Sequence, residues 1–205
     1  AAGVNHASVV VSSRSASPQT ELTASVQTEL AEGVSGRMTL ELPEDCMDGL
    51  WVGDASTGSN AGTSIDLDAH QVTLDLSGTN LYELRFKPGE SGTHVISASV
   101  SVGSNTFPVS SASFEVYDLM VVPATYSMTT KTGRATVYAK PFLPVELEVE
   151  GGQTFAGTTN AYGRAYIDFT LPDDVYPSQR VTLTAKMGEK TAQAGIAFLG
   201  GISVE

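Results

Sequence analysis

The chain has 205 residues, of which 41% are hydrophobic and 17% are charged, a composition that supports a packed core and excludes a disordered protein. Its 23 acidic and 11 basic side chains give a net charge of −12, which argues against nucleic acid and anionic membrane surfaces as partners. The single cysteine excludes an internal disulfide and a multi-thiolate metal site, and no apolar run is long enough for insertion into a membrane.

Apolar and polar residues alternate along the first half of the chain. A period of two places successive side chains on opposite faces of a strand, so each such segment has one buried and one solvated face. Half-buried strands are typical of antiparallel sheets, whereas the strands of a buried parallel sheet are apolar throughout. No stretch of a dozen residues has a helical period. The alternating segments are residues 22–30, 37–42, 71–76 and 82–87.

The second half of the chain repeats this pattern with tighter turns. Residues 145–150 alternate and are followed by Gly151-Gly152, which predicts a hairpin because glycine readily adopts the positive φ of such turns. Short strands separated by frequent turns are typical of β-sandwiches. The sequence therefore predicts an all-β chain of two tandem immunoglobulin-like antiparallel β-sandwiches. The remaining predicted strands are residues 165–171, 181–185 and 192–198.

A step in charge marks the boundary between the two predicted domains. Residues 1–118 hold 15 acidic and 4 basic side chains, whereas residues 119–205 hold 8 acidic and 7 basic ones. We expect an acidic first domain over residues 1–117, with a long loop near residues 53–64, and a second domain over residues 118–205. Both lengths fit usual domain sizes.

The beginning of the sequence is compatible with a processed mature chain, an excised fragment or a tag remnant, whereas its C-terminal end indicates a piece of a longer protein. The chain begins Ala1-Ala2-Gly3, and a Gly200-Gly201 pair leads into a further apolar–polar alternation in residues 202–205. We therefore expect adjacent domains as intramolecular partners.

Two acidic groups are the candidates for a metal site. Glu44, Asp45 and Asp48 lie close together in one predicted turn, and Asp66 and Asp68 share a face if their segment is extended. Calcium is bound by six to eight oxygen atoms and often by such turns, so calcium is the one cofactor that these residues suggest. The alternative is that they are solvated acids, since the EF-hand pattern is absent.

The histidines and the cysteine do not form a recognisable site. His6, His70 and His94 have no neighbour at ligand spacing, although a site assembled from distant strands remains open. Cys46 lies among acidic residues, which raise the pKa of a thiol and make it a poor nucleophile. We expect Cys46 to be a small buried apolar residue. Patterns for a nucleophile elbow and a phosphate loop are also absent, so the sequence predicts a protein that is not an enzyme.

Aromatic residues are the candidates for ligand binding. Trp51 precedes a small, polar and glycine-rich stretch, where an exposed indole can stack on a sugar ring or a peptide. Tyr82 and Phe86 share one face of a predicted strand and complete the candidate set. The alternative, favoured by the flanking Leu50 and Val52, is that Trp51 lies in the core between the sheets.

Residues 157–165, GTTNAYGRA, and the following YIDFTLP at residues 166–172 carry a known pattern. Asn160 and Gly163 are expected to form a tight turn, after which alternate residues enter the core. The pattern resembles the turn and strand of bacterial immunoglobulin-like repeats, including invasin-type surface modules. The resemblance is clearest in residues 119–199 and implies a sandwich architecture exposed on a bacterial surface.

These observations favour a non-enzymatic segment of a bacterial secreted or cell-surface protein. We expect it to act as a spacer, a stalk or an adhesive module, with a surface protein or a glycan as its ligand. A calcium-stiffened adhesin is a variant of this hypothesis. The alternative is an ancillary carbohydrate-binding module of an extracellular polysaccharide-active enzyme, which would bind glycan through Trp51.

Overall fold

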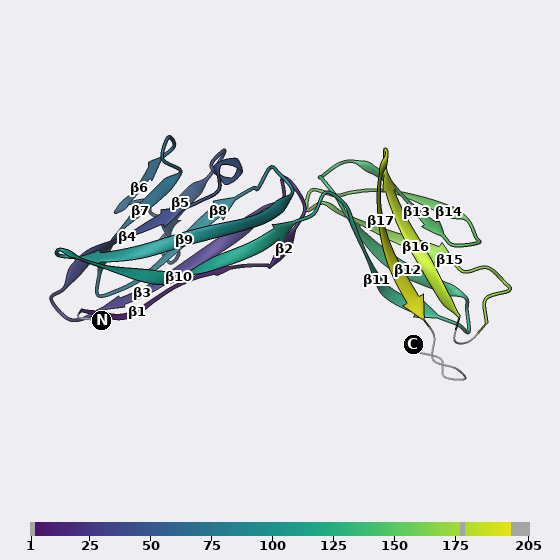
Figure 1. Ribbon diagram of the computed structural model, residues 1–205, viewed down its shortest axis with the longest axis horizontal. Helices are drawn as coiled ribbons and strands as arrows, with labels where there is room; N and C mark the ends of the chain where they lie inside the picture. The colour runs from purple at the N-terminus through teal and green to yellow at the C-terminus, as the bar shows by residue number, and fades with distance from the viewer. Residues whose placement is uncertain (1–2, 177–178, 198–205) are drawn as a thin grey trace. The chain divides into compact units, whose positions relative to one another are not determined.

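The computed structural model describes residues 3–176 and 179–197. Apart from one turn of 3-10 helix, η1 (Glu44–Cys46), every regular element in these ranges is a strand, so the predicted all-β class is confirmed. The chain divides into two compact units (Figure 1). The first contains the chain up to Ala16 and Glu21–Val116, and the second contains Ser17–Thr20 and the chain from Tyr117 onward.

Two sheets of unequal width build the first unit. Strand pairing is antiparallel throughout, except for a two-residue parallel bridge between β2 and β10. The four-stranded sheet has the order β1 (Val4–Val11), β3 (Leu22–Leu30), β8 (Thr79–Phe86) and β5 (Trp51–Asp54). The six-stranded sheet has the order β2 (Ser15–Ala16), β10 (Asn105–Val116), β9 (Gly92–Val102), β4 (Ser35–Glu41), β7 (Gln71–Ser77) and β6 (Thr63–Asp66).

The core of the first unit follows the alternation in the sequence. In β3, β4, β7 and β8 the buried side chains stand at every second position, with partly or fully exposed residues between them, although β4 and β8 each begin with three residues that are not buried. Phe86 and Phe114 are among the largest fully buried side chains, and their rings lie 5.7 Å apart. The two inner faces therefore meet in one apolar layer, as expected for a β-sandwich.

The second unit is a seven-stranded sandwich with antiparallel pairing throughout its described residues. Its strands divide three and four between the sheets, with the fourth strand in chain order beside the third. In a constant-type immunoglobulin domain the fourth strand instead belongs to the sheet of the first, second and fifth strands. The second unit is therefore a variant of that arrangement. One sheet has the order β11 (Met120–Ser127), β12 (Thr132–Tyr138) and β15 (Arg164–Thr170). The other has the order β14 (Thr154–Thr158), β13 (Pro144–Val149), β16 (Arg180–Met187) and β17 (Lys190–Ala197).

Turn chemistry explains two connections of the second unit. Gly151 has a φ of +70° and closes the predicted hairpin between β13 and β14, in which Leu147 pairs with Phe155. The side-chain oxygen of Asn160 accepts bonds from the backbone N–H groups of Tyr162 and Arg164, and Gly163 has a φ of +73°. Both turns confirm the sequence prediction, and β15 then alternates between buried and exposed residues as expected.

Candidate functional site

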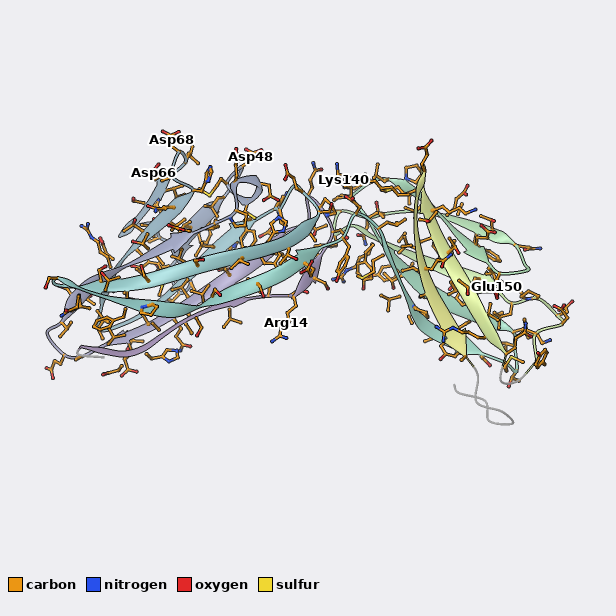
Figure 2. The ribbon with its side chains drawn as sticks, in the orientation of Figure 1. Arg14, Asp48, Asp66, Asp68, Lys140 and Glu150 are labelled. Carbon is orange, nitrogen blue, oxygen red and sulfur yellow. The ribbon has the colours of Figure 1, made fainter. Side chains whose placement is uncertain are left out.

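The predicted calcium ligands lie around one margin of the first unit but do not converge. Glu44 and Asp45 are in η1, and Asp48 follows it. Figure 2 shows Asp48, Asp66 and Asp68 at this margin. Strand β6 ends at Asp66, so Asp68 lies in the next turn and the two do not share a strand face as expected. The Asp66 carboxylate instead accepts bonds from the backbone N–H groups of Asp68 and Ala69, both at 3.1 Å. Because β6 ends at Asp66, the carboxylates of Asp66 and Asp68 do not form the expected pair on one strand face, and Asp66 stabilises the turn that follows.

One cluster in the described ranges brings three possible metal ligands within 4.8 Å of one another: Asp45, Cys46 and His94. The Nε2 atom of His94 lies 2.7 Å from Oδ2 of Asp45, and its Nδ1 atom lies 3.0 Å from the carbonyl oxygen of Gly92. Both ring nitrogens thus face acceptors, and both can donate only when the imidazole is positively charged. This cluster joins residues 49 positions apart, which no sequence spacing could have indicated.

Asp45 is held by further hydrogen bonds. Its Oδ2 atom accepts the backbone N–H groups of Gly89 and Glu90, at 3.0 and 2.9 Å. Burial raises the pKa of Asp45, but the hydrogen bond and charge of His94, with the bonds from Glu90 and Gly89, outweigh it and hold the pKa below its usual value. The carboxylate therefore ties η1 to the loop before β9.

The thiol in this cluster is buried, and its ionisation is disfavoured. Cys46 is fully buried, which confirms the sequence prediction. Burial, with a further contribution from the charge of Asp45, raises the pKa of Cys46 to about 12. To bind here, a metal ion would have to displace the thiol proton of Cys46 and at least one of the two hydrogen bonds of the His94 ring. The His94 ring also stacks on Phe114 at 5.2 Å, so the cluster is a structural clamp on the first core.

Trp51 lies on the outer face of the four-stranded sheet, not in the core as the flanking residues suggest. Val52 occupies the inward position of β5, and alternation turns its neighbour Trp51 outward. The indole is half-buried because it covers Gly53, where an added Cβ would lie 2.7 Å from Cζ2 of Trp51. Arg85, opposite Trp51 on β8, places its guanidinium carbon 4.4 Å from the ring centroid. Sequence analysis missed Arg85 because strand register brings it there.

The other two aromatic candidates point to the opposite side of the same sheet. Phe86 is 1% exposed and packs on Phe114 inside the first core. Tyr82 is 5% exposed, and its hydroxyl donates to the carbonyl oxygen of Asp75 at 2.6 Å. The structure therefore separates Trp51 from Tyr82 and Phe86, and of these three rings only the indole lies on the outer face of the sheet.

Surface hollows lie in both units, and a hollow of about 660 Å³ over β13 and β14 of the second unit adds to the two described next. The first, of about 380 Å³, lies beside η1 and the β6–β7 hairpin. The second, of about 850 Å³, lies over β11, β12 and β15, where the exposed ion pair between Arg134 and Asp168 (2.7 Å) stands among threonine hydroxyls. No helix in the described part of the chain is both long and apolar enough to cross a membrane.

Comparison with known proteins finds similarity in architecture only. No protein-family model and no curated protein sequence matches the chain. The type II cohesin dyad of the adaptor scaffoldin ScaA from Acetivibrio cellulolyticus is 9% identical, over 97% of this chain and 98% of that one, with a TM-score of 0.38. The adhesin InvE of Yersinia pseudotuberculosis is 15% identical, over 96% of this chain and 60% of that one, with a TM-score of 0.32. The BSP domain of a biofilm-associated protein is 8% identical, over 97% of this chain and 52% of that one, with a TM-score of 0.36.

These structural neighbours are cohesin-like domains and domains of bacterial adhesins and biofilm proteins, without a shared sequence family. At such identities and scores the similarity carries no argument about function. The function of this chain is therefore argued from its own residues.

Proposed function

We propose that the chain is a non-catalytic segment of a bacterial secreted or cell-surface protein that acts as a spacer, a stalk or an adhesive module. The observation that carries this proposal is the clamp formed by Asp45 and His94. In the described ranges it belongs to the one cluster of three potential metal-ligating groups, Asp45, Cys46 and His94. The Asp45 carboxylate and both His94 nitrogens make hydrogen bonds within the protein, and the high pKa of Cys46 favours the protonated thiol. Its residues are therefore arranged to hold the fold together, not to react.

The division of the chain into units supports a modular role. Each unit has a hydrophobic cluster of its own, so each sandwich can be stable without a shared core. We place the boundary between the modules at residues 117 and 118, and we propose that further domains adjoin this segment in a longer protein. We also propose that its ligand is a surface protein or a glycan.

Display on a bacterial surface tests the proposal. The chain is inserted between an outer-surface anchor and an epitope tag in a non-adherent strain, with the anchor and tag alone as the control. A spacer makes the tag accessible to a bulky antibody, and an adhesive module retains the cells on immobilised proteins or glycans. A displayed and folded chain that changes neither quantity would refute the proposal.

A second candidate function is glycan binding as an ancillary module of a polysaccharide-active enzyme. The outward position of Trp51 beside a polar loop favours it, because movement of the Arg85 guanidinium away from the indole would let the ring stack on a sugar. Affinity electrophoresis in gels that contain soluble polysaccharides tests this function. Retardation that is lost in Trp51→Ala, and kept in a control at another exposed aromatic residue, Tyr166→Ala, would support it.

A further inference from the structure

The six-stranded sheet of the first unit carries a core-facing residue that no opposing strand covers. On its edge strand β6, Ile65 pairs with Val72 of β7, and Val72 is fully buried. Directly paired residues of antiparallel strands point to the same face, so Ile65 points to the core side of the sheet. Ile65 is nevertheless 41% exposed. The opposing sheet has only four strands, and the edge of the wider sheet extends past the shared core.

The space beside Ile65 is a groove with apolar walls. Met47 and Leu50, which follow η1, line its other side, and Leu67 at the hairpin turn is 63% exposed. Together these residues enclose the hollow of about 380 Å³ described above, which we call the η1–β6 groove. An apolar side chain placed there would cover Ile65 and extend the buried layer of β7 onto the core face of β6.

The rim of the groove is acidic. Glu44 and Asp48 line it, and Asp66 and Asp68 stand in the adjoining hairpin (Figure 2). The surrounding sequence, residues 38–84, contains nine acidic residues and neither lysine nor arginine. Its one basic side chain is His70, which lines the groove. A ligand that enters the groove therefore meets apolar walls inside a negative field.

We propose that the η1–β6 groove binds an extended segment of a partner protein in which an apolar side chain is flanked by lysine or arginine. The apolar side chain would lie against Ile65, and the flanking cations would face Asp48 and Asp68. Strand β6 ends the order of its sheet, so its outer edge is open to an extended segment whose alternate side chains enter the groove.

The observations favour this occupant over two others. A second copy of the chain carries the same net charge of −12, which opposes self-association through an acidic rim. A glycan is disfavoured because no tryptophan, tyrosine or phenylalanine ring lines the groove. The inference rests on the proposed adhesive role for its biological setting. Peptide binding is tested on purified protein and adhesion on displayed cells, so the groove and the adhesive role can each be refuted separately.

The test uses three short peptides and the whole chain. The probe is acetyl-KTKIKTK-amide, in which one isoleucine stands between lysines, and its controls are KTKTKTK, which lacks the apolar side chain, and ETEIETE, which reverses the charge. Titrations followed by two-dimensional NMR report both affinity and location. We expect the probe to bind with a Kd on the order of 1 mM or below, with shifts centred on Met47, Leu50 and Ile65, and both controls to bind at least roughly tenfold more weakly.

Matched variants locate the interaction. Ile65→Thr keeps a strand-forming residue and is expected to weaken probe binding roughly tenfold, whereas Val95→Thr, at a residue of similar exposure elsewhere on the same sheet, leaves it unchanged. The double variant Asp48→Asn with Asp68→Asn should weaken binding and flatten its salt dependence. Glu29→Gln with Glu32→Gln, which neutralises two exposed acids of the same unit, is the control for total charge.

Three results would overturn the inference. One is equal binding of KTKIKTK and KTKTKTK, which would indicate non-specific attraction of cations. Another is unchanged probe binding by Ile65→Thr with a native spectrum. The third is self-association through the groove, detected by sedimentation as a dimer that the probe cannot displace.

Discussion

His94 and Asp45 form a 2.7 Å hydrogen bond at the margin of the first core, between strand β9 and the η1 turn. Their side chains are only 6% and 13% exposed, and the opposite nitrogen of His94 is held by a backbone carbonyl. The pair thus fixes η1, which forms one side of the groove, to strand β9 of the sheet.

Removal of one partner should destabilise the first unit. Asp45→Asn keeps the size of the side chain but loses the charge that pairs with His94, so we expect the free energy of unfolding to fall by about 2 kcal/mol. Urea unfolding followed by circular dichroism measures the change as a lower midpoint at unchanged slope. Asp48→Asn is the control because Asp48 is exposed, and a change there within about 0.5 kcal/mol is expected. Equal stability of both variants would show that the clamp contributes nothing.

The same carboxylate predicts a dependence of stability on acid. The pKa of Asp45 is lower in the folded chain than its ordinary value of 3.8, so its contribution is complete above that value and is lost as the pH falls through the folded value. We therefore expect the free energy of unfolding to decrease as the pH drops below about 4. The decrease should be smaller in Asp45→Asn, and parallel curves for the two proteins would contradict the prediction. The pKa values of Asp54 and Asp168 are also lowered in the folded chain. Their contributions are the same in both proteins, so they cancel when the stability curve of Asp45→Asn is subtracted from that of the unchanged chain.

Cys46 should resist thiol reagents in the native chain. Its pKa is raised from 9.0 to about 12, so at pH 8 the thiolate fraction is about a thousandfold lower than in the unfolded chain. Burial of the sulfur slows the reaction further. The rates of reaction with a colorimetric disulfide reagent, with and without denaturant, test this expectation. A native rate close to the denatured one would mean that the clamp opens readily.

The position of Trp51 can be tested by its fluorescence, because it is the only tryptophan. Gly53→Val should displace the indole from the sheet, since an added Cβ would lie 2.7 Å from the ring, and the emission should shift to the red with stronger acrylamide quenching. Gly89→Ala is the matched control, because a Cβ there makes only ordinary contacts at 3.8 Å. An unchanged spectrum in Gly53→Val would disprove the packing of Trp51 on Gly53.

Calcium should have little effect on stability. The five acids considered as ligands are dispersed, with Asp45 committed to His94 and Asp66 to its own turn. We expect the melting temperature to change by less than about 1 °C between excess chelator and millimolar calcium, since a cation stabilises a protein only by binding its folded state. A rise of several degrees that disappears in Asp48→Asn would restore the calcium hypothesis.

Sequence patterns predicted much of each sandwich because alternation and turn chemistry act locally. Alternate residues of β3 and β15 lie in their cores as expected, and the turns at Gly151 and Asn160 form where predicted. The same alternation, applied to the Trp51-Val52 pair, would have placed the indole outside. The flanking apolar residues concealed this, since Leu50 belongs to the preceding turn and not to the strand.

The sequence by itself determined the all-β class, the faces of most strands and the burial of Cys46. Only the tertiary structure decided that Arg85 covers Trp51, that His94 clamps Asp45, and that one sheet extends past the other to leave Ile65 uncovered. Local periodicity selects the direction in which a side chain points. Its partner depends on strand register and on the relative width of two sheets, and these are settled by burial of surface between segments far apart in the chain.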